Sequence, residues 1–173
     1  MSTRTARAVG ALALTAASLV GTAALAAPAW AATTTARVSF GNLIVTGGPE
    51  ANGFLFTRAA DGAVTVHDTK PAAMTAGTGC TQQDATTVRC SGVENLNVNG
   101  GGGDDSIDND TGSDGGNPNV GLPSTLNGGD GNDRLSGSTG PDQLIGLAGT
   151  DRASGNAGVD ICDAETESGC EQN

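Results

Sequence analysis

A nine-residue repeat constrains this chain more than any other feature. From residue 128 to residue 163, four nonapeptides follow one another without insertions, as GGDGNDRLS, GSTGPDQLI, GLAGTDRAS and GNAGVDICD. Each has Gly at its first and fourth positions and Asp at its sixth; these are Gly128, Gly137, Gly146 and Gly155, then Gly131, Gly140, Gly149 and Gly158, then Asp133, Asp142, Asp151 and Asp160. A Gly- and Asp-rich linker would not hold three residue classes in one frame, so the pattern predicts a repeat architecture.

The same frame extends toward the N-terminus with one interruption. Residues 100–108 fit it well, with Gly100, Gly103, Asp105 and Ile107 in place, whereas residues 119–127 have Ser124 at the Asp position. Residues 91–99 keep only the apolar eighth position, and the ten residues 109–118 break the frame. We therefore expect repeats over residues 91–163, interrupted at 109–118, with no clear stacked partner for Asp105.

Each repeat combines six turn residues with a three-residue extended segment. Alternation directs the middle, apolar residue of that segment inward and its two neighbours outward. So short a strand is stable only when stacked on others, which predicts two repeats per coil. The turn of Gly128 then lies over that of Gly146, and the turn of Gly137 over that of Gly155.

This stacking brings Asp133 close to Asp151 and Asp142 close to Asp160. Paired carboxylates repel each other unless they are protonated or bridged by a cation. The glycine turns add backbone carbonyls, and a cage made only of oxygen suits Ca²⁺ better than Mg²⁺. The candidate calcium-binding residues are Asp133, Asp142, Asp151, Asp160 and Asp105, together with Gly128, Gly131, Gly137, Gly140, Gly146 and Gly149.

At these residues the chain resembles the RTX, or haemolysin-type, calcium-binding repeats, whose pattern is GGxGxDxUx. The resemblance covers residues 100–108 and 128–163, and it implies a right-handed parallel β-roll with Ca²⁺ between stacked turns. Ser138, Leu147 and Asn156 depart from the pattern at the second glycine. The cysteine-flanked arrangement is also similar to that of small secreted actinobacterial proteins with such repeats.

Residues 1–31 have the features of a secretory signal peptide. Arg4 and Arg7 precede an Ala/Leu/Val run over residues 8–27, and residues 29–31 offer a small-x-small cleavage site. The alternative is a retained membrane anchor, for which the run is only mildly apolar. We expect a mature chain of residues 32–173 that is secreted to the outside of the cell.

Residues 32–90 form a β segment in our interpretation. Apolar residues alternate at four places, namely Val38 and Phe40, Leu43 and Val45, Phe54 and Phe56, and Val64 and Val66. Residues 71–79 are expected to be a loop, and residues 87–89 a return strand.

The four cysteines, Cys80, Cys90, Cys162 and Cys170, indicate disulfides in an exported chain. Local pairing would close two small loops, but the connectivity is one of three possibilities. A zinc site is the rival, although neither spacing is typical of structural zinc. The second pair, with Glu165, Glu167 and Glu171, is expected to form a C-terminal cap over residues 164–173, because a solenoid must cover its last coil.

The charge distribution limits the possible partners. Residues 91–173 contain fifteen acidic residues and only Arg134 and Arg152 as bases, a net charge of −13. Nucleic acid and anionic membranes are poor partners for such a surface, and nothing in the mature chain indicates membrane insertion.

Other functional classes find little support. Residues 104–114 are acidic but do not fit an EF-hand loop, and no hydrolase or metalloprotease motif occurs. Aspartates that recur every nine residues suit a repeated ligand better than the paired acids of a glycosidase. The sequence therefore predicts a monomeric, non-enzymatic, all-β calcium-binding protein that folds when extracellular Ca²⁺ binds. The alternative is a surface or matrix module, rigidified by calcium, that binds a cell-wall or polysaccharide partner.

Overall fold

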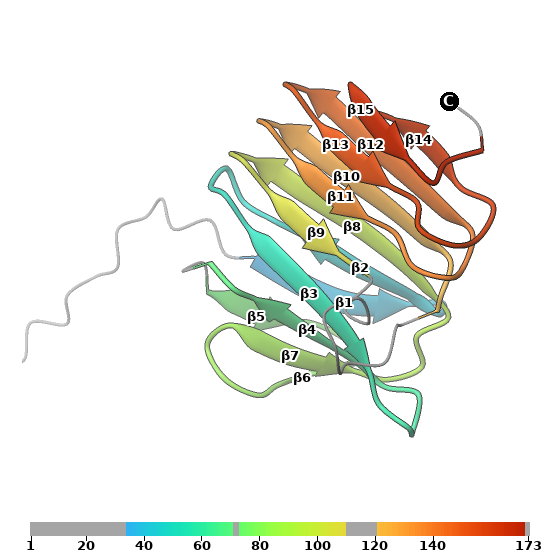
Figure 1. Ribbon diagram of the computed structural model, residues 1–173. Coiled ribbons are helices and arrows are strands. Elements are labelled where there is room, and N and C mark those ends of the chain that lie inside the picture. Colours follow the sequence, from blue (N-terminus) through green and yellow to red (C-terminus); the bar gives the residue numbers. More distant parts are fainter. Residues whose placement is uncertain (1–33, 71–72, 110–120, 172–173) are drawn as a thin grey trace, which may run out of the picture.

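The computed structural model describes residues 34–70, 73–109 and 121–171. These residues form strands and turns arranged as two facing sheets around one core, with no helix among them (Figure 1). The expectation of an all-β fold is thereby confirmed. The expected signal peptide and all but one residue of the 109–118 interruption lie outside the described residues.

The chain alternates between the two sheets from residue 95 onward, one strand to each in turn. The first sheet contains, in spatial order, β14 (Ile161–Asp163), β12 (Asp142–Ala148), β10 (Ser124–Asp130), β8 (Asn95–Gly102), β2 (Asn42–Thr46), β1 (Thr34–Ser39) and β5 (Met74–Ala76). The second contains β15 (Thr166–Ser168), β13 (Arg152–Ser154), β11 (Arg134–Ser136), β9 (Ser106–Asp108), β3 (Gly53–Arg58), β4 (Val64–Asp68), β7 (Thr87–Cys90) and β6 (Cys80–Gln82).

Both sheets are mixed. Strands β8 to β15 pair only in parallel, and β2 and β3 join them in parallel through β8 and β9. Antiparallel pairs are confined to the other end, where β1 pairs with β2, β4 with β3 and β7, and β6 with β7. The repeats therefore rest on an antiparallel base.

The strand register explains the break in the repeat frame. Leu144 pairs with Leu126, eighteen residues earlier, so one coil holds two nonapeptides. Leu126 pairs with Val98, twenty-eight residues earlier. The extra ten residues equal the length of the interruption at 109–118, so the repeats resume in register after it.

The N-terminal β segment is continuous with the repeats. Leu43 pairs in register with Leu96, and Phe54 with Ile107. No break in either sheet occurs at residue 90, where we placed the end of this segment. The parallel stack therefore begins before the first recognisable glycine repeat.

The eighth position of the nonapeptide lies inside the protein, as predicted. The fully or almost fully buried residues at this position are Val98, Leu126, Leu144 and Cys162 in the first sheet, and Ile107, Leu135 and Ala153 in the second. Phe54 and Phe56 are also fully buried. These side chains form one continuous core between the sheets.

Two expectations for the N-terminal segment are wrong. Phe40 does not belong to an inward-facing alternation, since it lies in the tight β1–β2 turn with φ of 49° and is fully exposed. Residues 74–76, placed in a loop, form β5, because β1 offers them a free edge to pair with. Residues 87–90 do form the expected return strand, β7.

The cysteines pair locally, as Cys80 with Cys90 and Cys162 with Cys170. No cysteine is free, so the zinc alternative is excluded. The first disulfide joins β6 to β7, and the second ties the buried Cys162 of β14 to the end of the described chain. The two disulfides therefore lie at opposite ends of the sheets.

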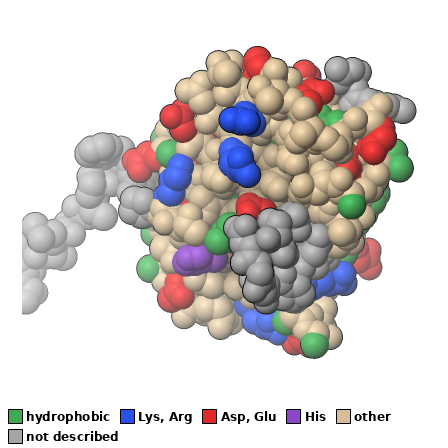
Figure 2. Space-filling view, in the orientation of Figure 1, with side chains coloured by type: hydrophobic (Ala, Val, Ile, Leu, Met, Phe, Trp, Pro, Cys, Tyr) green, Lys and Arg blue, Asp and Glu red, His purple; other side chains and the backbone are tan. Residues whose placement is uncertain are grey.

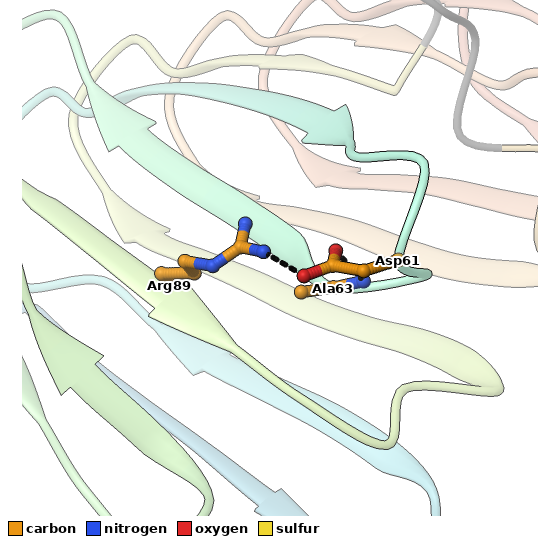
Figure 3. Close-up of polar contacts among 3 residues, drawn as sticks. All are labelled: Asp61, Ala63 and Arg89. Atoms are coloured by element: carbon orange, nitrogen blue, oxygen red, sulfur yellow. Dashed lines mark hydrogen bonds and ion pairs between the residues drawn. The ribbon is translucent and has the colours of Figure 1, made fainter.

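An ion pair crosses the surface of the antiparallel base. The Arg89 guanidinium contacts the Asp61 carboxylate, which also accepts a hydrogen bond of 3.1 Å from the Ala63 backbone N–H (Figure 3). Both charged side chains are partly exposed, so this pair contributes little to stability. The described residues contain no helix able to span a membrane.

Candidate metal centre

The glycine turns of the repeats stack along two edges of the sheets. The turns that lead from the first sheet to the second, residues 100–105, 128–133 and 146–151, form what we call the Asp133 edge. The return turns, residues 137–142 and 155–160, form the Asp142 edge. Backbone hydrogen bonds of 2.8 Å from Gly131 to Ala148 and of 3.1 Å from Ala157 to Ser138 join successive turns, as the two-repeat coil predicts.

On the Asp133 edge, each carboxylate binds the backbone of the preceding turn. Asp151 Oδ1 accepts from the Asp133 N–H at 2.8 Å, and Asp133 Oδ1 accepts from the Asp105 N–H at 2.8 Å. Asp105 Oδ1 accepts in turn from the Asn52 N–H at 2.5 Å. At the C-terminal end, Glu165 Oε2 takes the Asp151 N–H at 2.7 Å. The result is one ladder of four carboxylates. It runs from the turn of Asn52 through the three turns of this edge to the turn of Glu165.

The Asp142 edge carries a shorter ladder of the same kind. Asp160 Oδ1 accepts from the Asp142 N–H at 2.9 Å, and Glu171 Oε2 accepts from the Asp160 N–H at 2.5 Å. Asp142 Oδ1 accepts from the Ser124 hydroxyl at 2.6 Å, while its Oδ2 takes the Ser138 N–H. The two aspartate pairs expected from the sequence are thus both brought together.

Asp105 has a stacked partner, contrary to our expectation. Its partner is Asp133, because the ten-residue interruption leaves the register of the coils unchanged. Ser124 occupies the Asp position on the opposite edge, facing Asp142, and so does not replace a partner of Asp105. The interruption breaks the nine-residue frame of the sequence but not the strand register of the structure.

The second oxygen of most of these carboxylates is buried without a partner. Among the described residues, Oδ2 of Asp105, Asp133, Asp151 and Asp160 makes no hydrogen bond. A buried anionic oxygen left without a partner is costly, and such groups call for a compensating ligand.

The first glycine of each repeat makes room for this second oxygen. A Cβ atom on Gly128 would lie 2.1 Å from Asp133 Oδ2, and one on Gly146 would lie 2.3 Å from Asp151 Oδ2. Neither glycine has a positive φ, so steric space rather than backbone conformation requires glycine there. Gly131 and Gly149, at the fourth position, instead adopt φ values of 137° and 149°.

Backbone carbonyls approach the same space from the neighbouring turns. A Cβ on Gly100 would lie 2.5 Å from the Gly128 carbonyl oxygen, and one on Gly155 would lie 2.2 Å from that of Gly169. No three His, Cys, Asp or Glu side chains gather within the described residues, so carbonyl oxygens would supply the remaining ligands. Unpaired carboxylate oxygens beside carbonyls form a hard, oxygen-only donor set that fits Ca²⁺.

Comparison with known families agrees with this geometry. Residues 126–162 match the model of the RTX calcium-binding nonapeptide repeat, in four copies. The chain carries RTX repeats. These repeats bind calcium ions. No curated protein and no solved structure matches the chain.

Burial sets the protonation of the RTX carboxylates in the calcium-free protein. It raises the pKa of Asp105 to about 6, and it also raises the pKa values of Asp133, Asp142 and Asp160. The hydrogen bond from the Asp151 N–H, in contrast, lowers the pKa of the exposed Glu165. The two ladders therefore bring together carboxylates that are costly to ionise until a cation is present.

Sequence reasoning missed four residues of the ladders. Asn52 and Ser124 lie at their N-terminal ends, and Glu165 and Glu171 provide the last carboxylates, although we had assigned both glutamates to the cap. A signal for Asn52 was present, since Gly47, Gly48, Asn52 and Phe54 occupy the first, second, sixth and eighth positions of a nonapeptide. The glutamates carry no such signal, because the C-terminal loop leaves the nine-residue frame.

The space beneath Gly128 provides a direct test of this geometry. Gly128→Ala forces Cβ into Asp133 Oδ2. Overpacking costs about 1–3 kcal/mol, and about 1.4 kcal/mol corresponds to tenfold, so we expect calcium affinity to fall by about five- to 150-fold. The control is Gly102→Ala, where a Cβ would make only ordinary contacts, the nearest at 3.5 Å. Calorimetric calcium titration measures both variants. Equal affinities would contradict the steric role.

Acidification should stabilise the calcium-free fold. The raised pKa of Asp105 means that the folded chain binds more protons than the unfolded chain between the unfolded pKa near 4 and a folded pKa of about 6. Stability therefore rises as the pH falls from 7 to about 5. Circular dichroism in EGTA measures this as a β signal that grows while the pH falls, and Asp105→Asn should reduce this pH dependence. A wild-type chain that loses stability over this range would refute the assignment.

Proposed function

We propose that this protein is exported and binds calcium in a right-handed parallel β-roll whose folding depends on extracellular Ca²⁺. The observation that carries the proposal is the pair of carboxylate ladders. Asp105, Asp133, Asp151 and Asp160 each bind backbone through one oxygen and bury the other without a partner. A bound Ca²⁺ would offset the negative charge of these buried oxygens.

Coupling to folding follows from the charge balance. Residues 91–173 carry a net charge of −13, and compacting like charges is unfavourable. An ion that binds only the folded state adds its binding free energy to stability. At low cytosolic calcium the repeats would stay expanded, and outside the cell calcium would close the roll. An affinity of roughly 10⁻⁴ to 10⁻³ M is sufficient for such extracellular modules.

Export is supported by the basic and apolar character of residues 1–31 and by the two disulfides. A disulfide-bonded chain is suited to an oxidising compartment. We propose that the mature protein begins near residue 32 and acts as a secreted monomer.

We also propose that the protein is not an enzyme. Its only histidine, His67, contacts the Thr87 hydroxyl at 3.0 Å across neighbouring strands. The buried carboxylates recur in every coil, as repeated ligands do, and do not form one acid–base pair at a single site.

Calcium titration followed by circular dichroism tests the proposed function. We expect the β signal to rise on adding calcium to protein held in EGTA, because calcium neutralises the ladders. Asp133→Asn should require about tenfold more calcium, since it removes a charged ligand, while Asp130→Asn, an exposed residue of the same turn, should behave as wild type. A spectrum that is fully β in EGTA and unmoved by calcium would refute coupled folding.

The same variant tests the separation of the two edges. The Asp133 carboxylate accepts a hydrogen bond from the Asp105 N–H, and the Asp133 N–H donates to the Asp151 carboxylate. No hydrogen bond of the ladders links Asp133 to Asp142 or Asp160. In Asp133→Asn, amide hydrogen exchange should speed up first in residues 100–105 and 146–151. Equal acceleration at 137–142 and 155–160 would argue against independent edges.

The C-terminal disulfide has a matched control in the N-terminal one. Replacing Cys162 and Cys170 by Ser frees the loop that carries Glu165 and Glu171, so calcium affinity should fall along with stability. Replacing Cys80 and Cys90 by Ser should cost a similar stability of about 2–4 kcal/mol, so coupled folding lowers the apparent calcium affinity of both variants. The first variant should lose more affinity, because it also frees Glu165 and Glu171. Calorimetry and proteolysis of both variants decide this. An equal loss of affinity in the two variants would mean that the loop is no cap.

A further inference from the structure

The outer face of the second sheet brings two arginines together on adjacent strands. Arg134 of β11 and Arg152 of β13 are direct partners in the strand register, followed along the same row by Thr166 of β15. They are the only basic residues among residues 91–173. Figure 2 shows two basic side chains next to each other on this face, with mostly uncharged surface around them.

Neither arginine is neutralised by the described part of the chain. Asp133 and Asp151 directly precede the two arginines, but their carboxylates are buried in the turns and bind backbone N–H groups. Arg89, in contrast, is paired with Asp61 (Figure 3). In a chain with a net charge of −11, two adjacent guanidinium groups with no acidic partner among the described residues are unexpected. Like charges on directly opposed strand positions are also destabilising.

A cavity of about 200 Å³ lies at the arginine pair. It is lined by Arg134, Arg152, Ser154, Thr166 and Ser168, with Leu135 and Ala153. At about 30 Å³ per water, this space holds a small oxyanion and several waters. Ser154 donates its hydroxyl proton to Asn156, but the hydroxyls of Thr166 and Ser168 make no hydrogen bond within the described residues, so both can donate to a ligand.

We propose that this cavity, the arginine site, binds a phosphate group. Two planar guanidinium forks side by side match the oxygens of a phosphate, and hydroxyl donors complete such sites. A phosphate anion between the arginines also replaces their mutual repulsion with two attractions. The site uses none of the calcium ligands. By strand register, the nearest acid on this face is Asp108 of β9, the partner of Ser136. Strand β9 lies on one side of β11, and β13 with Arg152 lies on the other.

Calorimetric titration with glycerol phosphate, whose calcium salt is soluble, tests the arginine site in calcium-containing buffer. Arg134→Gln and Arg152→Gln should each weaken binding by about tenfold, the loss of one charge-assisted hydrogen-bonding group. Arg37→Gln removes the same charge from the exposed face of β1 and should change binding by less than about twofold, because distant surface charges are screened. Circular dichroism in calcium checks that each variant folds.

The conservative variants separate a shaped site from general attraction. Arg134→Lys and Arg152→Lys keep the charge but lose the planar fork, so both should still bind several-fold more weakly than wild type. The proposal is overturned if wild type does not bind glycerol phosphate, if the Gln variants bind as well as wild type, or if Arg37→Gln or the Lys variants fail to behave as stated.

A second titration identifies the source of the phosphate. Poly(glycerol phosphate) presents the same group repeatedly along a chain. Affinity at least tenfold higher per phosphate than for glycerol phosphate would identify a phosphodiester polymer as the ligand, through rebinding of neighbouring groups. Equal affinity per phosphate would identify a small phosphate ester, and either result requires the arginine site.

Discussion

The hydrogen bond from a backbone N–H of one turn to the carboxylate of the next is the interaction on which the repeat structure depends. It fixes the vertical spacing of the turns and orients the carboxylates from Asn52 to Glu165 on one edge and from Asp142 to Glu171 on the other, where the Ser124 hydroxyl donates to Asp142 in place of a backbone N–H. One oxygen is thereby satisfied. The other, at Asp105, Asp133, Asp151 and Asp160, is held in the interior of the turn, where a cation or a proton must offset its charge.

Glycine at the first position follows from the same constraint. The second carboxylate oxygen occupies the space of a side chain, as at Gly128 and Gly146, so even a methyl group would collide with it. The second position is less strict. Leu147 and Asn156 adopt positive φ values there, a conformation that disfavours residues with a side chain, but no carboxylate fills the space. The requirement for glycine thus comes from ligand geometry at the first position, whereas at the fourth position the backbone itself favours glycine, through the positive φ of Gly131 and Gly149.

The two ends of the stack differ in how they protect the core. At the N-terminal end, the coils rest on antiparallel strands joined by the Cys80–Cys90 disulfide and packed around Phe54 and Phe56. At the C-terminal end, the segment closed by the Cys162–Cys170 disulfide packs Ala164 and Cys170 against the core and contributes Glu165 and Glu171 to the two ladders. The same segment therefore contacts the core and completes the carboxylate series.

The sequence by itself determined the period, the inward-facing apolar positions and the aspartate pairs, because each depends on residues spaced within one or two repeats. The pairing of Asp133 with Asp151 follows from counting eighteen residues. Only the tertiary structure decided the partner of Asp105, the place of Asn52 below it and the closing glutamates. Those contacts join segments separated by an interruption or by loops outside the nine-residue frame, and their distance along the chain carries no periodic signal. The face shared by Arg134 and Arg152 shows both contributions. The repeat aligns the two arginines, while the burial of the neighbouring aspartates leaves them without a counter-charge among the described residues.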